Sequence, residues 1–112
     1  MLNTKNTTSQ LEEFIVLKEN KALHKLYFTE ILFVEAFGDY VKVHTKEKTI
    51  TTHSTFSKFI DNLPNYFLRT HKSFSINLNR MNHLSGNQIT LDIHTIPIGQ
   101  TFKQNVLKAL NL

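Results

Sequence analysis

Between residues 14 and 98 the chain is a succession of short β-type segments separated by turn residues, and this pattern restricts the fold more than any other feature. The clearest segment is YVKVHT at 40–45, in which Val41 and Val43 alternate with larger or more polar residues. Alternate residues of a strand face opposite sides, so the two valines are expected to form a buried face. Strands are expected at 14–19, 25–28, 32–37, 40–45, 49–53, 66–71, 73–78, 81–93 (a hairpin around Gly86–Asn87) and 96–100. The sequence therefore predicts a mainly β fold of short antiparallel sheets.

Helical spacing of apolar residues occurs in only two places. The first predicted helix lies in mid-chain, with Ser54 as its N-cap and Pro64 as its end. The second is amphipathic and lies at the C-terminus. The apolar residues at helical spacing are Phe56, Phe59, Ile60 and Leu63 in the first helix and Phe102, Val106, Leu107 and Leu110 in the second. Residues 29–31 are expected to form one isolated helical turn.

The last predicted hairpin supplies further core candidates. Alternation over 81–93 predicts that Leu84, Ile89, Leu91 and Ile93 face the core. Pro97 has no backbone N–H to donate to a ladder, so the strand at 96–100 is expected at a sheet edge.

Length and charge restrict the organisation of the chain. With 112 residues, it is expected to form one domain with a modest core. Residues 1–12 are polar and lack periodicity, which predicts a flexible leader or linker before a domain at 13–112.

The charge is distributed unevenly along the chain. Residues 1–56 contain equal numbers of lysines and acids, whereas 57–112 contain six Lys or Arg and two Asp, a net charge of +4. A basic half favours a polyanionic partner; a basic surface that is merely solvated is the alternative.

Several classes of function lack the residues that they require. The chain has no cysteine, which excludes disulfides, thiolate catalysis and cysteine-ligated zinc. Its six histidines are not spaced as in known metal-binding motifs, and its three glycines are too far apart to form a phosphate-binding loop. The GxSxG motif of serine hydrolases is absent. No apolar run approaches the ~18 residues that span a membrane, and there is no signal peptide. We expect a cytoplasmic protein that is not an enzyme and needs no metal, cofactor or membrane.

The segment LRTHKSFSINL at 68–78 carries an unusual group of cations. Arg69, His71 and Lys72 fall within four residues, directly before an alternating apolar run. A cation on a well-anchored loop can contact a phosphate or the edge of a guanine. The alternative is structural: Arg69 pairs with an acid such as Glu35, and His71 only hydrogen-bonds the backbone.

The motifs along the chain resemble the LytTR family of bacterial DNA-binding domains. The resemblance covers residues 14–110, through ILFVEAFGDYVKVHT, LPNYFLRTHKSFSINLNRMNHL and IPIGQTFKQNVLKAL. Its most specific part is Phe67, Arg69, His71, Ser73, Phe74 and Asn77. The resemblance implies small β-sheets whose loops, rather than a recognition helix, enter successive major grooves of double-stranded DNA.

The resemblance also implies a biological setting. Family members are output domains of transcriptional regulators, often behind a phosphoacceptor receiver domain. The 112 residues contain no receiver, so we expect either a stand-alone version or a piece of a longer protein, in which residues 1–12 would be the linker. The expected target is DNA with direct repeats, bound by two copies of the domain. The alternative is a protein- or RNA-interaction module without DNA specificity; because few aromatic residues fall at surface positions, a platform for unpaired bases is not evident.

Carried over by position, the resemblance implies that three loops face DNA. The first surrounds Asp39 and Tyr40, the second presents Lys72 to base edges and Ser73 to a phosphate, and the third carries Gln100. The residues expected at the interface are Asp39, Tyr40, Lys42, Arg69, His71, Lys72, Ser73, Gln100 and Lys103.

Within the second loop, Arg69 and His71 are expected to brace the backbone while Lys72 points outward. The third loop departs from the family pattern, because Gly99–Gln100 replaces the usual Ser–Arg. Arginine prefers guanine and glutamine prefers adenine, so a changed base preference is expected there.

Overall fold

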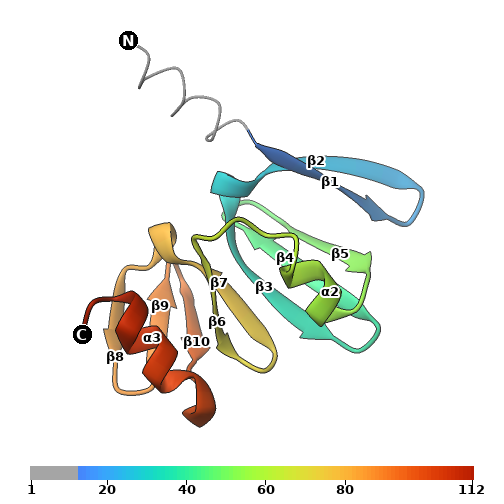
Figure 1. Cartoon of the computed structure of the whole chain (residues 1–112). Helices are drawn as coiled ribbons and strands as arrows, with labels where there is room; N and C mark the ends of the chain where they lie inside the picture. Colours follow the sequence, from blue (N-terminus) through green and yellow to red (C-terminus); the bar gives the residue numbers. More distant parts are fainter. Residues whose placement is uncertain (1–12) are drawn as a thin grey trace, which may run out of the picture.

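The computed structural model describes residues 13–112, which form three small antiparallel sheets, two short helices and three 3-10 turns (Figure 1). The strands are β1 (Phe14–Glu19), β2 (Ala22–Tyr27), β3 (Ile31–Phe37), β4 (Tyr40–Thr45), β5 (Thr49–His53), β6 (Phe67–His71), β7 (Phe74–Asn77), β8 (His83–Ser85), β9 (Gln88–Leu91) and β10 (His94–Pro97). The helices are α2 (Phe56–Ile60) and α3 (Lys103–Ala109), and the 3-10 turns are η1 (Phe28–Glu30), η2 (Leu78–Arg80) and η3 (Gln100–Phe102). The predicted mainly β class, with a mid-chain and a C-terminal helix, is confirmed. The predicted leader at 1–12 lies outside the described residues.

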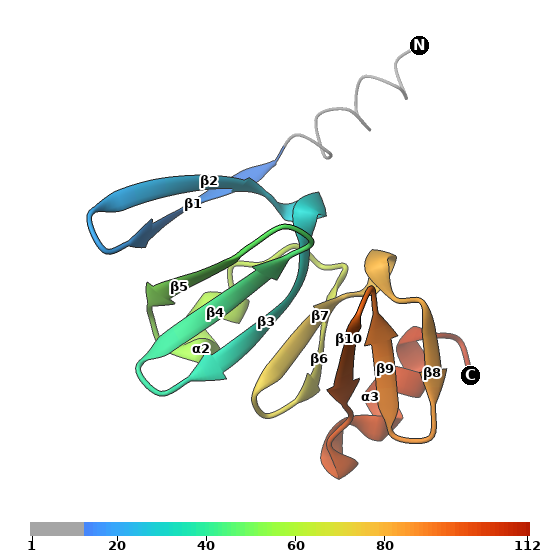
Figure 2. The ribbon, with the colours of Figure 1, turned by 180° about the vertical axis from the view of Figure 1, so that it is seen from behind.

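The central sheet has five strands in the order β5-β4-β3-β7-β6. The hairpin of β1 and β2 packs beside it, and β10, β9 and β8 form the third sheet (Figure 2). The bounds of β4 and β5 agree with the prediction. By contrast, β2 begins three residues earlier than expected and β10 covers 94–97 rather than 96–100, although β10 does lie at a sheet edge as predicted.

Strand β3 separates two hydrophobic cores. Val34 faces one core and its neighbour Phe33 faces the other, as alternation along a strand requires. The first core is covered by the β1–β2 hairpin and α2, and it contains Leu17, Leu26, Phe28, Ile31, Val34, Val41, Val43, Ile50 and Phe59. The second lies under the third sheet and α3, and it contains Leu32, Phe33, Ile76, Ile89, Leu91, Ile96, Ile98 and Val106. The central sheet is thus supported from both sides.

Two sequence-based predictions about single residues are wrong. Ile93 was expected in the core but is 85% exposed, because β9 ends at Leu91 and the chain turns at Asp92, whose φ is 54°. The N-cap of α2 is Thr55 rather than Ser54: the Thr55 hydroxyl accepts a hydrogen bond from the Lys58 amide at 3.2 Å.

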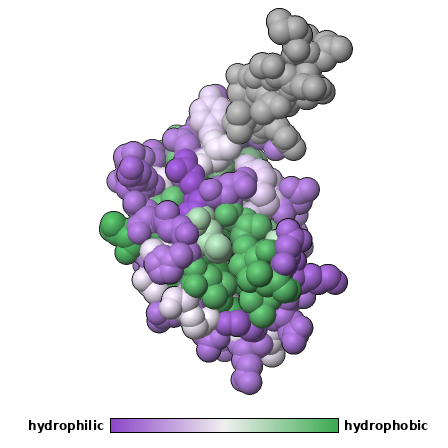
Figure 3. Space-filling model, turned by 90° about the vertical axis from the view of Figure 1, so that its left-hand side faces the viewer, coloured by the Kyte–Doolittle hydropathy of each residue, from purple (hydrophilic) through white to green (hydrophobic). Residues whose placement is uncertain are grey.

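The end of the molecule near β8 and the C-terminus leaves part of the second core open. Figure 3 shows a broad apolar area on this side, surrounded by hydrophilic side chains. The side chains that pack against the second core and are only partly buried are Leu68, Phe74, Leu78, Met81, Leu84 and Leu110. Across residues 13–112, no helix has both the length and the apolar character needed to cross a bilayer.

Candidate nucleic-acid interface

Three loops that are far apart in the sequence meet at one edge of the molecule. The β3–β4 turn, the β6–β7 turn and η3 all lie along the lower edge in Figure 1, and the view from behind agrees (Figure 2). Strand order explains the first two, because β7 runs antiparallel to β3 and so begins beside the end of β3. The Ala36 amide donates to the Ser73 carbonyl at 2.9 Å, and the Gly99 amide donates to the Thr70 carbonyl at 2.8 Å. These two hydrogen bonds tie the outer loops to the middle one.

The middle loop is braced by Arg69. Its Nε donates to the His71 carbonyl at 3.3 Å, and a terminal nitrogen donates to the Lys72 carbonyl at 2.6 Å. The guanidinium also lies 5.2 Å from the ring centroid of Phe56 and 5.5 Å from that of Phe102. Arg69 therefore joins α2, η3 and the β6–β7 turn through one planar group.

His71 fixes the same turn from the other side. The Ser73 amide donates to His71 Nδ1 at 3.1 Å. Because a backbone amide can only donate, Nδ1 is the acceptor and the neutral ring carries its proton on Nε2. Arg69 and His71 are thus loop braces, as the sequence suggested. The alternative pairing of Arg69 with Glu35 is wrong, since the Glu35 carboxylate lies 2.9 Å from Nε2 of His44.

Lys72 stands at the outside of this loop. Its carbonyl is held by Arg69, while its side chain is exposed. Within the part of the chain that the structure describes, the ammonium group makes no hydrogen bond or ion pair. Ser73 follows it and is partly buried. The loop therefore presents a free cation from a rigid backbone.

The first loop brings aromatic rings to the same edge. Gly38 has a φ of +60°, which allows the tight turn, and the Asp39 carbonyl accepts from the Ser54 amide at 3.2 Å. The Tyr40 ring is 45% exposed and packs edge-on against His53, with centroids 5.3 Å apart. Lys42 is partly buried, further along β4. The sequence did not single out His53, which reaches this edge because β5 pairs with β4.

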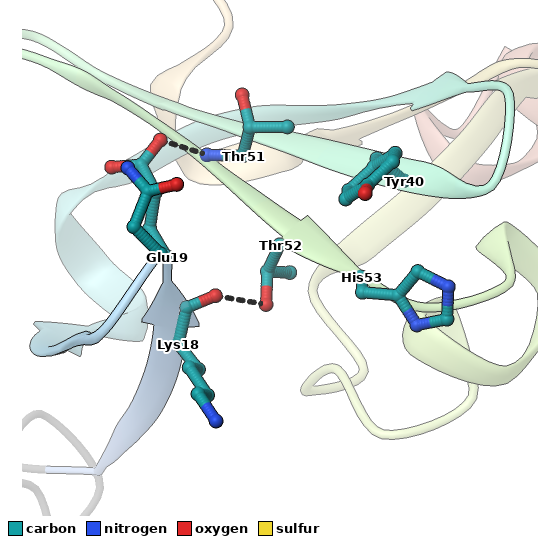
Figure 4. A pocket seen from close by; sticks show the side chains of 7 residues that line it. Lys18, Glu19, Tyr40, Thr51, Thr52 and His53 are labelled. Carbon is teal, nitrogen blue, oxygen red and sulfur yellow. Dashed lines mark hydrogen bonds between the residues drawn. The ribbon is translucent and has the colours of Figure 1, made fainter.

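Next to this loop, the tip of the β1–β2 hairpin is fastened to β5. The Glu19 carboxylate accepts from the Thr51 amide at 3.0 Å, and the Thr52 hydroxyl donates to the Lys18 carbonyl at 2.8 Å (Figure 4). Tyr40 and His53 line the same open hollow. These contacts occupy part of the β5 edge, which would otherwise be unpaired.

The third loop presents Gln100. Its side chain is exposed at the start of η3, directly after Gly99. A Cβ on Gly99 would lie 3.2 Å from the Phe102 ring and 3.5 Å from the His71 ring, so these rings fill the space that the missing side chain leaves. Lys103 has partners within the chain: its ammonium donates to the Gly86 carbonyl at 2.6 Å and to the Asn87 amide oxygen at 2.9 Å. The sequence did not predict this contact with the β8–β9 turn.

The face of the central sheet opposite the first core holds a partly buried histidine, His44. The His44 ring stacks on Phe33 with centroids 4.2 Å apart, and its Nδ1 lies 3.1 Å from the Thr49 hydroxyl. Burial lowers the pKa of His44 below its ordinary value of 6.5, and this effect outweighs the opposing attraction of Glu35. No group of three or more potential metal ligands occurs among residues 13–112.

Comparison with known proteins decides the family. The family model of the LytTr DNA-binding domain matches residues 21–111. The chain belongs to the LytTR family. A transcriptional regulatory protein of Bacillus subtilis (strain 168), NatR, is 32% identical over 82 residues, which are 72% of this chain but 35% of that protein. This LytTR domain thus spans about a third of the length of the curated relative.

A solved structure supports the same fold. It is a LytTr DNA-binding domain from Bacillus cereus, which superimposes with a TM-score of 0.79 at 22% identity. The match covers 90% of this chain and 99% of the solved one. The family is described as a DNA-binding domain, and the solved domain comes from a protein described as a putative methyl-accepting/DNA response regulator. The expected fold and family are therefore confirmed, whereas the contacts of single residues with DNA stay predictions.

Proposed function

We propose that this LytTR domain binds double-stranded DNA sequence-specifically in the control of transcription, with its three loops set into successive major grooves. The observation that carries the proposal is the convergence of the β3–β4 turn, the β6–β7 turn and η3 on one edge. Two exposed polar side chains of different chemistry, Lys72 and Gln100, extend from that edge. A rigid backbone beneath exposed readers is the arrangement that direct readout of base edges requires.

We assign different roles to the residues of this interface. Lys72 and Gln100 read base edges, and Ser73 contacts a phosphate beside them. Tyr40, Asp39 and Lys42 form the contact of the first loop. Arg69 and His71 act through the backbone that they hold. Lys103 braces the β8–β9 turn and adds positive charge to the edge.

The wider setting is also part of the proposal. The chain acts by binding rather than by catalysis, in the cytoplasm, as the output domain (residues 13–112) of a response-regulator-type protein. Residues 1–12 serve as a leader or linker, which in a longer protein would join the domain to a receiver domain, as the greater length of the curated relative allows. Two copies bind direct repeats whose centres are separated by a whole number of turns, about 10–10.5 bp each.

The salt dependence of binding tests the proposal. A duplex recovered from a random library by the protein should bind with a logarithmic slope of roughly −0.9 per neutralised phosphate when salt is varied. The net charge of +4 in residues 57–112 supports a steep slope. Single-stranded DNA and RNA of the same sequence should compete poorly. Tight binding that ignores salt, or equal competition by the single strands, would contradict the proposal.

A further inference from the structure

The end of the β3–β4 hairpin carries two exposed aromatic rings. Phe37 is 52% exposed and Tyr40 is 45% exposed, and the two residues are directly opposite each other in the antiparallel register. Residues 41 and 43 of β4 point into the first core, so Tyr40 and Lys42 lie on the opposite face of the sheet. That face is covered by the second core at Phe33, but at the end of the hairpin, where the three loops meet, the rings of Phe37 and Tyr40 are exposed.

The contacts of Phe37 leave about half of the residue exposed to a partner. Lys42 Nζ lies 3.9 Å from the ring centroid, a cation–π contact. Glu35 is the register partner of Lys42, but its carboxylate is already occupied by His44 at 2.9 Å. The ammonium of Lys42 consequently rests on an aromatic face rather than on a carboxylate, and it is free to move to a stronger anion.

The turn beside Phe37 has unobstructed space. Apart from Gly38 itself and its two chain neighbours, no residue has an atom within 4 Å of a Cβ placed on Gly38. A narrow hairpin end with this clearance can approach the floor of a major groove, which is about 12 Å wide. The thymine C5-methyl is the apolar group that base pairs display there, and Phe is among the side chains that contact it.

We propose that Phe37 is a specificity-determining residue of the DNA interface, with its ring against the C5-methyl group of a thymine while Lys42 contacts a neighbouring phosphate. This inference rests on the proposed function and adds to it a residue that the family resemblance did not supply. It makes the first loop a reader of thymine, whereas Lys72 and Gln100 read polar base edges.

The chain contains a matched control. Phe14 is 49% exposed and has Lys25 Nζ at 4.4 Å from its ring centroid, so its local surroundings resemble those of Phe37. It lies on β1, at the end of the molecule away from the three loops (Figure 1). Phe14→Ala therefore removes an equivalent exposed ring without touching the proposed interface.

Replacing thymine with deoxyuridine removes only the methyl group, and this makes the test specific. A duplex selected by the wild-type protein is resynthesised with each thymine replaced in turn, and dissociation constants are measured at one fixed salt concentration. For the wild type, one or two replacements should weaken binding about fourfold, as expected for one buried methyl group. Phe37→Ala should bind the original duplex more weakly by a similar factor and should no longer respond to those replacements. Phe14→Ala should behave as the wild type.

The outcomes separate the two proposals. If Phe37→Ala responds to every replacement as the wild type does, or if the wild type responds to none, Phe37 reads no thymine and this inference is overturned alone. If no duplex motif can be selected at all, the proposed function fails and the inference fails with it. Melting curves of both variants establish that a loss of affinity is not a loss of folding.

Discussion

The guanidinium of Arg69 lies 2.6 Å from the carbonyl oxygen of Lys72, the residue whose own side chain extends freely into solvent. One cation thus holds the backbone from within while the next faces outward. Hydrogen bonds from a charged donor are stronger than neutral ones, and the planar fork of arginine can serve two carbonyls at once. This division separates residues that shape the loop from residues that are available to bind.

Arg69→Lys should weaken DNA binding although the charge is retained. Lysine cannot donate in two fixed directions or stack between Phe56 and Phe102 as arginine does. We expect a loss of about 0.5–1.5 kcal/mol in unfolding free energy, the usual net contribution of a hydrogen bond, because the two carbonyls are partly or fully exposed. The less ordered loop should also reduce the affinity for DNA. Fluorescence anisotropy and thermal melting measure the two effects.

A matched charge control is available for this variant on α3. Lys108 is exposed on the last turn of the helix. Lys108→Met removes a full positive charge but should change affinity much less than Arg69→Lys, which removes none. Wild-type affinity in Arg69→Lys would mean that charge, and not the hydrogen-bonded brace, is what the loop requires.

Lys72→Ala and Phe74→Ala should have opposite effects. Lys72 is exposed, so its loss should change stability by less than about 0.5 kcal/mol while costing about 1–3 kcal/mol of specific binding. Phe74 packs near Phe33 and His71 but is only partly buried. Phe74→Ala should therefore cost about 2–3 kcal/mol of stability, less than a fully buried ring. Denaturant titration and binding isotherms on the same samples measure both effects. If Lys72→Ala unfolds the domain and Phe74→Ala leaves its stability unchanged, Lys72 is the side chain that packs inward and Phe74 the one that faces solvent.

Local patterns predicted the strands well because strand pairing preserves alternation. Val41 and Val43 alternate in the sequence and are both fully buried. The same rule failed at Ile93, because a turn with positive φ at Asp92 ended the alternation. Asp adopts a positive φ more often than most residues other than glycine, but such cases are uncommon, so the residue type alone did not predict the turn.

The interface was predictable only in part for a different reason. Family resemblance pointed to Lys72 and Gln100, but their proximity depends on long-range pairing, such as the Gly99 amide with the Thr70 carbonyl. No local spacing encodes that contact. The exposed ring of Phe37 was likewise hidden, because in the sequence it reads as the last apolar residue of a buried strand.

The stability of the domain should fall at mildly acidic pH, in part through His44. Burial lowers the pKa of the folded histidine below the ordinary value of 6.5, so the unfolded chain binds the proton first as the pH decreases. The contribution of His44 is fully present above pH 6.5 and is lost as the pH falls through the lower pKa of the folded state. Thermal melting between pH 7.5 and 5.5 should show a steeper loss for the wild type than for His44→Gln.

The groups around His44 define the control for this experiment. Glu35, Lys42 and His94 face the ring, and all are retained in His44→Gln. His83 is exposed on β8, so His83→Gln should keep the wild-type slope. A wild-type slope in His44→Gln as well would show that the acid sensitivity of the domain arises elsewhere.

Gln100→Arg should change which base pair the third loop prefers. The exposed amide of Gln100 can accept from N6 and donate to N7 of adenine, whereas arginine donates twice to O6 and N7 of guanine. We expect the wild type to favour A·T at one position of each repeat and Gln100→Arg to shift that position towards G·C by about 1–3 kcal/mol. Selection from one randomised duplex library, run with both proteins at the same salt concentration, measures the shift.

The added charge of Gln100→Arg needs a control. Because arginine adds a positive charge, the variant should bind every DNA sequence more tightly than the wild type, so the test is the change in the selected motif and not the change in affinity. Lys72→Ala in the same selection should relax a different position, since Lys72 belongs to the β6–β7 turn. Identical motifs for the wild type and Gln100→Arg would mean that Gln100 reads no base, and the third loop would then contact only the DNA backbone.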